Sequence, residues 1–275
     1  FSTLNAQDGL PDPFIYAMDV DRQGVVWMAT SGGLSRYDGR TFRNFTTREG
    51  LILDEVQTVF LDPQGTVWCG MPFGVSRYDG HSFRNFTTEE GLVDPWARAL
   101  FRGGDGVLWV GTQQGLSRYD GHSFRTFTAQ DGLAGITVNA LAADGRGGLW
   151  IGTDKGLSHY DGHTFSTPGG LVKGAINTLH VDVDGTVWLG TAGGLWRWDG
   201  QAGRNFTARD GLASDQVISL FRDRQGLLWC GTYDGGACAY DGQFWTTLDT
   251  RDGLAGNRVT GIRQGSDHTL LFATD

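Results

Sequence analysis

The feature that most constrains this 275-residue sequence is a seven-residue phrase that returns along the chain. "GLSRYDG" occupies residues 33–39 and 115–121, and close variants occupy residues 74–80 and 156–162. The phrase lies inside a longer unit that opens with Gly-Leu, and the opening glycines are Gly9, Gly50, Gly91, Gly132, Gly170, Gly211 and Gly253. A tryptophan recurs in phase, at Trp27, Trp68, Trp109, Trp150, Trp188 and Trp229. A period near forty residues is typical of a repeat architecture.

Each unit contains four short apolar segments separated by turn residues. In the second unit the pattern predicts strands over residues 56–62, 66–71, 74–79 and 82–88. The last two are joined through Asp-Gly, a strong hairpin signal because Gly adopts positive φ freely and Asp tolerates it. Four antiparallel strands in a unit of this length predict a blade of a β-propeller. We therefore expect an all-β, seven-bladed propeller formed by residues 1–275 as one domain.

The two ends of the chain bear on the blade count. Residues 253–275 supply the first two strands of a seventh unit, and residues 1–8 align with a fourth strand. The third strand, which would carry the "GLSRYDG" phrase, is missing from this unit. Either the ring closes with a three-stranded seventh blade that joins both termini, or the protein continues past Asp275. We favour continuation, and expect this chain to be a fragment of a longer protein.

Composition excludes some classes of partner. The formal net charge is −9 and the sequence pI is about 5.0. An acidic domain of this kind argues against nucleic acid or an anionic membrane surface as the main partner. No run of eighteen apolar residues occurs, so we expect no membrane contact within this segment.

Residues that could carry chemistry are scattered and are better explained by the repeat. The cysteines are Cys69, Cys230 and Cys238, without metal-binding spacing. Cys69 and Cys230 occupy an apolar core position of the unit, and a disulfide between Cys230 and Cys238 is the less favoured alternative. Three histidines follow "DG" at one turn position, and the "YDG" aspartates are explained by their turns. We therefore predict no catalytic residues, no metal and no cofactor.

The loops differ between the two faces of the predicted ring. Loops that lead into the first strand, or join strands two and three, share one face and vary between units, whereas the turns of the opposite face are alike. Rigid scaffolds tend to carry functional residues on such loops, although unconstrained loops also drift. The candidate ligand-binding residues on this variable face and at the channel mouth are Phe14, Tyr16, Gln57, Phe73, Trp96, Arg98, Asn139, Lys155, Asn177 and Tyr233. Mixed aromatic and polar groups around a concave ring predict a ligand site.

The unit closely resembles the two-component regulator propeller repeat. It has Trp-x-Gly-Thr, then Gly-Leu, then Arg-Tyr-Asp-Gly, and "LWVGTQQGLSRYDG" over residues 108–121 is the clearest copy. The resemblance implies seven-bladed propellers, often two in tandem, that form the extracytoplasmic sensor region of bacterial hybrid histidine kinases. It also implies a periplasmic or extracellular location in a membrane-anchored receptor, and some such receptors respond to polysaccharide breakdown products.

The combined reading predicts a ligand-binding sensor module that is not itself an enzyme. Its partner would be a small molecule or an oligosaccharide on the variable face, and a second propeller or a homodimer would be a further partner. The first alternative is a protein-interaction scaffold that uses the same face. The second is a lyase of the propeller type, which needs a histidine or an acid pair on that face. His180 is the one histidine on a predicted first strand, and it falls past the mouth.

Overall fold

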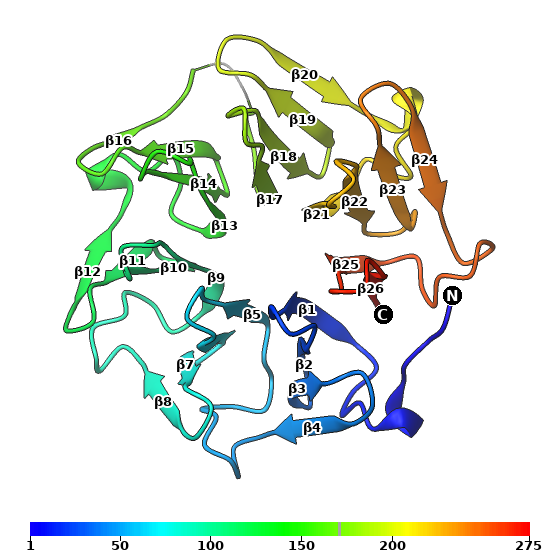
Figure 1. The fold of residues 1–275 in the computed structure, drawn as a ribbon. Helices are drawn as coiled ribbons and strands as arrows, with labels where there is room; N and C mark the ends of the chain where they lie inside the picture. The colour runs from blue at the N-terminus through cyan, green and yellow to red at the C-terminus, as the bar shows by residue number, and fades with distance from the viewer. Residues whose placement is uncertain (170–171) are drawn as a thin grey trace.

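The computed structural model describes residues 1–169 and 172–275, which form a ring of antiparallel sheets around a central axis (Figure 1). The first strand of each sheet lies nearest the axis and the fourth lies at the outer wall. The all-β prediction is confirmed, as are the four strands of the second unit. The predicted repeat start at Gly170 lies outside the described residues.

Among the described residues, six blades each contain four strands that follow one another along the chain. Blade 1 contains β1 (Ile15–Val20), β2 (Val26–Thr30), β3 (Gly33–Tyr37) and β4 (Phe42–Phe45). Blade 2 contains β5 (Thr58–Leu61), β6 (Val67–Met71), β7 (Gly74–Tyr78) and β8 (Phe83–Phe86). Blade 3 contains β9 (Ala97–Arg102), β10 (Leu108–Thr112), β11 (Leu116–Tyr119) and β12 (Phe124–Phe127). Blade 4 contains β13 (Val138–Ala143), β14 (Leu149–Thr153), β15 (Gly156–Tyr160) and β16 (Phe165–Ser166).

The remaining strands complete the ring. Blade 5 contains β17 (Ile176–Val181), β18 (Val187–Thr191), β19 (Gly194–Trp198) and β20 (Gly203–Phe206). Blade 6 contains β21 (Val217–Arg222), β22 (Leu228–Thr232), β23 (Ala237–Tyr240) and β24 (Trp245–Leu248). The seventh position holds β25 (Val259–Gln264) and β26 (Leu270–Thr274). Three short 3-10 helices lie in the connecting loops: η1 (Ala6–Asp8), η2 (Ala129–Asp131) and η3 (Ala208–Asp210).

The predicted count of seven blades is wrong. Across residues 1–169 and 172–275 there are six four-stranded sheets and one two-stranded sheet, β25–β26. Residues 1–5 form no strand, although the sequence predicts a fourth strand there. Phe1 does pack against Gly253 and Phe272, as Phe42 of β4 packs against Gly9 in blade 1. A fourth strand needs a third strand to pair with, and the described seventh sheet ends at its second strand.

The two-stranded sheet is nevertheless fastened to both of its neighbours. β25 contacts β1 on one side and β21 on the other, and both chain ends lie at this position (Figure 1). Ser219 of β21 donates a hydrogen bond to the carbonyl of Val259 at 2.9 Å. On the other side, Arg263 pairs with Asp19 of β1 at 3.2 Å. These polar contacts span the seventh position and close the ring.

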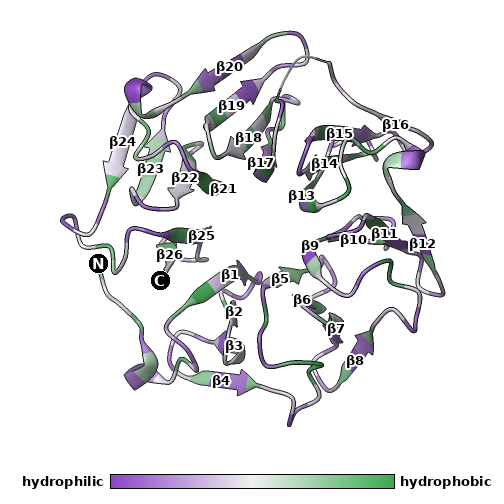
Figure 2. Cartoon of the chain, turned by 180° about the vertical axis from the view of Figure 1, so that it is seen from behind, coloured by the Kyte–Doolittle hydropathy of each residue, from purple (hydrophilic) through white to green (hydrophobic). Residues whose placement is uncertain are grey.

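Apolar packing runs between blades as well as within them. The largest buried cluster joins Trp27 and Phe45 of blade 1 to Val59, Val67 and Cys69 of blade 2. Seen from behind, the hydrophobic colour gathers on strands near the axis such as β21 and β25, whereas outer strands such as β8 and β20 are largely hydrophilic (Figure 2). Each blade therefore buries its faces against its neighbours, which is why the repeat must be preserved.

The second copy of the phrase, residues 74–80, shows what each of its residues does. Gly74 has φ +143°, and a Cβ there would lie 2.3 Å from the carbonyl oxygen of Phe86. The hydroxyl of Ser76 donates to the side chain of Asn85 at 2.7 Å. The Tyr78 hydroxyl donates to the carbonyl of Gly80 at 2.8 Å. Asp79, next in the chain, accepts from two turn amides and so caps the hairpin.

The two glycines of this phrase differ in a way that can be measured. Gly74→Ala is expected to lower the free energy of unfolding by about 2–4 kcal/mol, because it adds a backbone clash to an unfavourable φ. Gly80 has φ +98° but no heavy atom within 4 Å of the added Cβ. Gly80→Ala should therefore cost only about 1 kcal/mol. Urea unfolding of both variants measures the difference, and equal losses would contradict the proposed clash.

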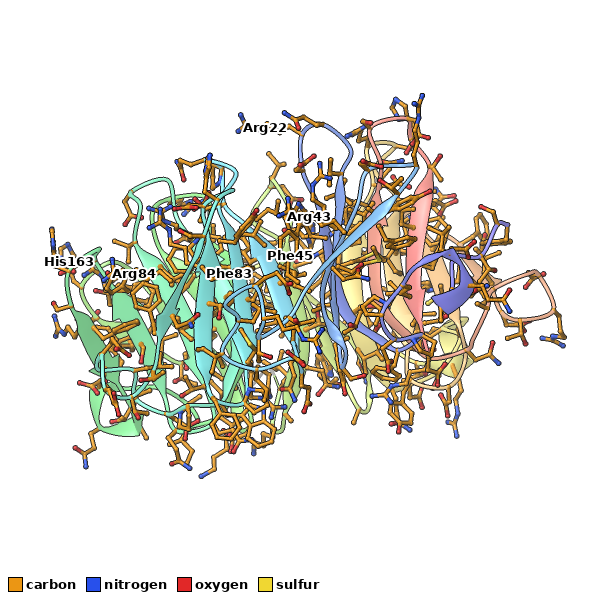
Figure 3. All side chains as sticks on the ribbon, turned by 90° about the horizontal axis from the view of Figure 1, so that it is seen from below. Arg22, Arg43, Phe45, Phe83, Arg84 and His163 are labelled. Atoms are coloured by element: carbon orange, nitrogen blue, oxygen red, sulfur yellow. The ribbon has the colours of Figure 1, made fainter. Side chains whose placement is uncertain are left out.

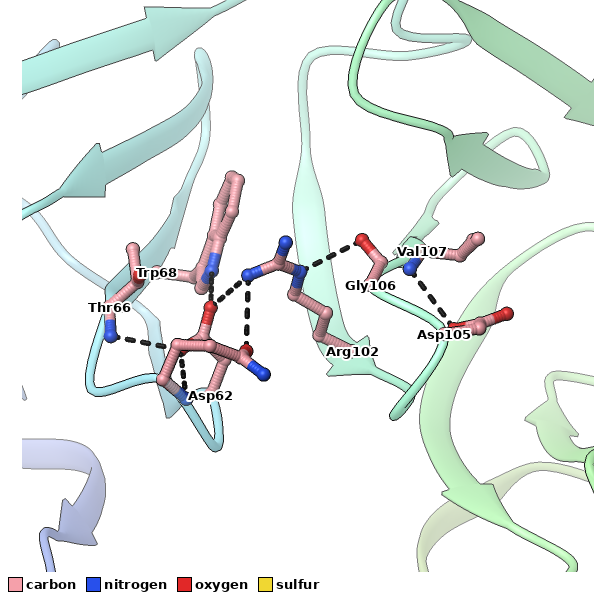
Figure 4. Close-up of polar contacts among 8 residues, drawn as sticks. Asp62, Thr66, Trp68, Arg102, Asp105, Gly106 and Val107 are labelled. Atoms are coloured by element: carbon pink, nitrogen blue, oxygen red, sulfur yellow. Dashed lines mark hydrogen bonds and ion pairs between the residues drawn. The ribbon is translucent and has the colours of Figure 1, made fainter.

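Hydrogen bonds and an ion pair centred on Asp62 join blade 2 to blade 3 (Figure 4). Asp62 follows β5, and its side chain is fully buried. One carboxylate oxygen accepts from the amides of Gln64 and Thr66. The other accepts from Trp68 Nε1 at 3.1 Å and from Arg102 of β9, with which it forms an ion pair. One carboxylate thus holds its own turn, its own blade and the next blade.

An equivalent aspartate, Asp182, joins blade 5 to blade 6 in the same way. Asp182 accepts from Trp188 Nε1 at 2.8 Å and pairs with Arg222 of β21. Burial alone would raise the pKa of Asp182, but hydrogen bonds from His180, Trp188 and Arg222 outweigh it and lower the pKa to about 2.

This depressed pKa predicts an acid-sensitive contribution to stability. An unfolded aspartate titrates near pH 3.9, so the unfolded chain binds a proton before the folded chain does as the pH falls. The stabilisation from Asp182 is therefore complete above about pH 5 and is lost between about pH 4 and pH 2. The difference in unfolding free energy between wild type and Asp182→Asn should shrink over that range. A difference that stays constant from pH 7 to pH 2.5 would contradict the assignment.

Candidate functional site

The central channel of the ring is lined by the first strands of successive blades. It encloses a volume of about 390 Å³. Three of the predicted site residues, Arg98, Asn139 and Asn177, line it. The variable loops lie at one end of the channel, and the turns that are alike in every unit lie at the other.

Two of these lining residues also fasten neighbouring strands. The amide of Asn139 donates to the carbonyl of Ile176 at 3.2 Å, and that of Asn177 donates to the carbonyl of Val217 at 3.1 Å. Each bond links the first strand of one blade to that of the next. The amide oxygen of Asn139 is buried and accepts no hydrogen bond from the described residues. Asn139 and Asn177 therefore have a structural role, and Asn139 keeps one acceptor.

Arg98 differs from the other channel residues. Its side chain is exposed at the mouth, and within residues 1–169 and 172–275 it forms no hydrogen bond or ion pair. At the other end of the channel, Arg263 is paired with Asp19. The guanidinium of Arg98 is therefore not engaged by another described residue, and its role as a ligand contact stays a prediction.

On the variable face, Arg258 is held between two aromatic rings. Its guanidinium carbon lies 5.0 Å from the ring centre of Phe14 and 4.7 Å from that of Tyr233. Phe14 in turn meets Tyr16 edge-on, with ring centres 4.7 Å apart. The Nε of Arg258 is buried and has no hydrogen-bond partner in the described part of the chain. Three predicted site residues from two blades are thus gathered around a cation from the seventh position.

A second contact extends this group to blade 3. Trp96 Nε1 donates to the side-chain oxygen of Gln57 at 2.8 Å. Gln57 also donates to Glu55 at 2.9 Å. Glu55 lies close enough to Tyr16 to influence its titration. We call these two neighbouring groups of contacts, which together span blade 6 to blade 3, the loop-face arc; its members are Tyr233, Arg258, Phe14, Tyr16, Glu55, Gln57 and Trp96.

The electrostatic setting of the arc keeps Tyr16 a hydrogen-bond donor. Burial raises the pKa of Tyr16, and the carboxylates of Glu55 and Asp12 raise it further, against a smaller lowering by Arg258. The phenol is therefore protonated at neutral pH. The arc combines aromatic faces, a phenol donor, a carboxylate acceptor, an amide and a cation.

Two predicted site residues lie apart from both the arc and the channel. Phe73 is 60% exposed in the β6–β7 loop, and it makes no aromatic contact with another described residue. Lys155 is exposed in the β14–β15 loop, and it forms no ion pair in the described structure. Both are on the variable face, but the structure does not bring them to the other candidates.

The sequence reasoning missed Arg258 and Glu55. Both lie five residues after the opening glycine of their units, the same offset as Phe14 and Trp96. An alignment of this one position across the units would have identified them. Their types differ so much between units, from Phe to Glu to Arg, that no shared motif draws attention to them.

Three further features of the described residues concern metal sites, disulfides and membrane-spanning helices. They contain no group of three or more His, Cys, Asp or Glu side chains that could hold a metal ion. The three cysteines are buried free thiols, and Cys230 faces Cys238 across β22 and β23 without a disulfide. No helix in residues 1–169 or 172–275 has the length and apolar character needed to cross a membrane.

The histidines with carboxylate partners lie away from the arc. His180 Nε2 is 3.3 Å from Asp182, and His159 Nε2 is 2.8 Å from Asp144. Both aspartates belong to turns between the first and second strands, which are on the opposite face of the ring. The arc therefore has no histidine–carboxylate pair among its members.

Comparison with known proteins identifies the repeat. Residues 9–32, 132–155 and 211–234 match the family model described as "Two component regulator propeller". The match covers these three segments, about a quarter of the chain. The resemblance seen in the sequence is confirmed by this match. A search of the curated proteins found no match.

Several solved structures have the same fold. One is described as the extracellular domain of a hybrid two component system from B. thetaiotaomicron, with a TM-score of 0.86 and 21% identity over 99% of this chain and 40% of that chain. A second, the extracellular domain of a one component system from the same organism, has a TM-score of 0.80 and 22% identity over 97% and 38%. The chain therefore spans well under half of these two relatives.

A likeness to an enzyme exists at lower identity. Streptogramin B lyase matches with a TM-score of 0.77 and 13% identity over 96% of this chain and 92% of that chain. At this level of identity the likeness concerns the fold, and a shared fold does not imply a shared activity.

Proposed function

We propose that this propeller is the ligand-binding sensor module of a bacterial two-component type receptor, and that its ligand binds on the loop-face arc. The observation that carries the proposal is the gathering of seven side chains from five positions of the ring around Arg258 and Trp96. Unconstrained loops that drift independently would not bring Phe14 and Tyr233 onto Arg258, or Gln57 onto Trp96. The repeats themselves, and extracellular domains of two-component systems among the similar structures, support the sensor role.

The chemistry of the arc favours an oligosaccharide. Aromatic faces such as Trp96 and Phe14 can cover the apolar side of a sugar ring, while Glu55 and Gln57 can bind its hydroxyl groups. Arg98 at the channel mouth would bind a further polar group of the ligand. The part of the loop face over blades 4 and 5 carries no aromatic loop residue, and it would leave room for the remaining sugar units of the oligosaccharide.

We further propose that the segment acts by binding and not by catalysis, in the periplasm or outside the cell, as part of a membrane-anchored receptor. The arc offers no histidine–acid pair for proton transfer. Signalling requires that bound and free states differ in free energy, because a ligand shifts an equilibrium only by its differential affinity. A second propeller or a second copy of the chain would supply the interface that responds.

A screen of oligosaccharides by thermal unfolding tests this function. A true ligand should raise the melting temperature of the wild type with saturation, since binding at about 100 times Kd adds about 2.7 kcal/mol of stability. The double substitution Trp96→Ala with Arg98→Ala should abolish that shift without unfolding the ring. Phe73→Ala, on the same face but outside the arc, is the matched control and should keep it.

The outcomes separate this proposal from its alternatives. A shift that is equally large in the double variant would place the ligand elsewhere. If no small molecule raises the melting temperature of the wild type, the face is a docking surface for a protein partner. Turnover of a bound saccharide, measured by product analysis, would contradict the non-enzymatic role.

A further inference from the structure

A second pocket lies between blades 2 and 3, beside the β9–β10 and β11–β12 turns of the face opposite the arc. Three arginine side chains line it: Arg77 of β7, Arg84 of β8 and Arg102 at the end of β9. Trp68 and Phe86 form its floor. Its volume of about 130 Å³ is below the roughly 300 Å³ at which pockets begin to bury drug-sized ligands. The space suits one polyatomic group and not an oligosaccharide.

The arginines are stacked on the aromatic floor. The guanidinium carbon of Arg77 lies 5.8 Å from the Trp68 ring centre, and that of Arg102 lies 5.9 Å from the same ring. The guanidinium carbon of Arg84 lies 4.8 Å from the ring centre of Phe86. Cation–π contacts of this kind do not use the guanidinium N–H groups, which can still bind other partners.

This arrangement places like charges together. Arg77 and Arg84 are direct cross-strand partners, and a pair of like charges at such positions is destabilising. Figure 3 shows Arg84 on the outer wall beside Phe83, and Arg43 next to Phe45 of the preceding blade. Blades 1, 3 and 5 repeat the cross-strand arginine pair. In the groove between blades 2 and 3, Arg102 of blade 3 is a third arginine beside the pair. The same position, at the end of the first strand, is Leu61 in blade 2 and Ala143 in blade 4.

The three guanidinium groups keep free donors. Arg77 and Arg84 form no hydrogen bond and no ion pair with the described residues. Arg102 donates from Nε to Gly106 and from Nη1 to Asp62 and Gln64, which leaves Nη2 without a partner there (Figure 4). The third arginine of the blade 5–6 groove is different, because Arg222 donates from Nε, Nη1 and Nη2.

We propose that the groove between blades 2 and 3 binds one oxyanion, a carboxylate, sulfate or phosphate group, between Arg77, Arg84 and Arg102. Guanidinium groups bind such anions by paired, charge-assisted hydrogen bonds. The anion offsets the repulsion of the cross-strand pair. In a chain with a net charge of −9, this groove gathers three arginines: Asp62 pairs with Arg102, while Asp79 and Glu90 lie near Arg77 and Arg84 without forming an ion pair with them in the described structure.

The test uses substitutions that the repeat itself supplies. Blade 6 has Ala239 and Thr246 where blade 2 has Arg77 and Arg84, so Arg77→Ala with Arg84→Thr installs a pair that folds elsewhere in the same ring. Arg118→Ala with Arg125→Thr in blade 3 makes the same change beside a neighbour that contributes no third arginine. Urea unfolding of both double variants confirms that they are folded.

Titration with sodium sulfate, phosphate and acetate at constant ionic strength is followed by the Nε–H resonances of the arginines. The signals of Arg77, Arg84 and Arg102 are expected to shift with saturation, and those of Arg118 and Arg125 to shift weakly and linearly. The blade 2 double variant should weaken binding, read from the Arg102 signal, by at least about tenfold, whereas the blade 3 variant leaves it unchanged.

The three salts distinguish the sources of the anion. Saturation with acetate alone identifies a carboxylate site, and saturation with sulfate and phosphate alone identifies a tetrahedral one. Linear shifts of equal size at all arginines, in all three salts, would show non-specific screening only and would overturn the proposal. Saturation that survives in the blade 2 double variant would overturn it as well.

Discussion

Asp62→Ala is expected to lower the free energy of unfolding by about 3–5 kcal/mol, the largest effect on stability that we predict for a single side chain. The carboxylate is fully buried and accepts from two amides, from Trp68 and from Arg102. Its removal leaves the Arg102 cation and the indole N–H without their acceptor in a poorly hydrated site. Urea unfolding and the thermal midpoint measure the loss, which for a ring of this size is roughly 10 °C.

A double-mutant cycle identifies the source of this loss. Arg102→Leu copies the residue that blade 2 carries at the equivalent position, Leu61. In the Asp62→Ala background it should cost less than in the wild type, because the charge that it removes is already unpaired. Asp79→Ala, which removes an exposed turn cap, should cost only about 1 kcal/mol. Additive losses for residues 62 and 102 would mean that their ion pair does not couple the two blades.

Much of this architecture could be predicted because the residues that each turn and strand needs recur at the same position in several units. Gly74 and Asp79 recur with their neighbours in almost every unit, and each recurrence reflects a positive φ, a close carbonyl or a capped turn. The strand limits in the second unit follow from these markers. The prediction failed at the seventh position, where pairing of a fourth strand depends on a third strand and not on the local pattern of residues 1–8.

The candidate site was less predictable for a physical reason. Contacts between loops depend on how far each blade turns about the axis, and one sequence does not specify this angle. The arc includes Phe14 and Trp96, which the sequence suggested, but is held together by Arg258, which it did not. Asn139 and Asn177, which the sequence suggested as mouth residues, line the channel, and their amides bond to neighbouring strands.

Arg258→Gln tests whether the ligand is bound by the arc or by the channel. For an oligosaccharide found in the thermal screen, the substitution should raise Kd by at least about tenfold, because a hydrogen bond to a charged group is worth about 1.5–3 kcal/mol. The guanidinium of Arg258 forms no hydrogen bond or ion pair with the described residues, and its Nε is buried, so its terminal nitrogens are the donors left for a ligand. Isothermal titration calorimetry measures Kd, and Lys155→Gln, which removes an exposed cation from the same face, is the matched control. Loss of affinity in Arg98→Ala together with full affinity in Arg258→Gln would move the ligand from the arc into the channel, whereas the reverse result would leave Arg98 outside the site.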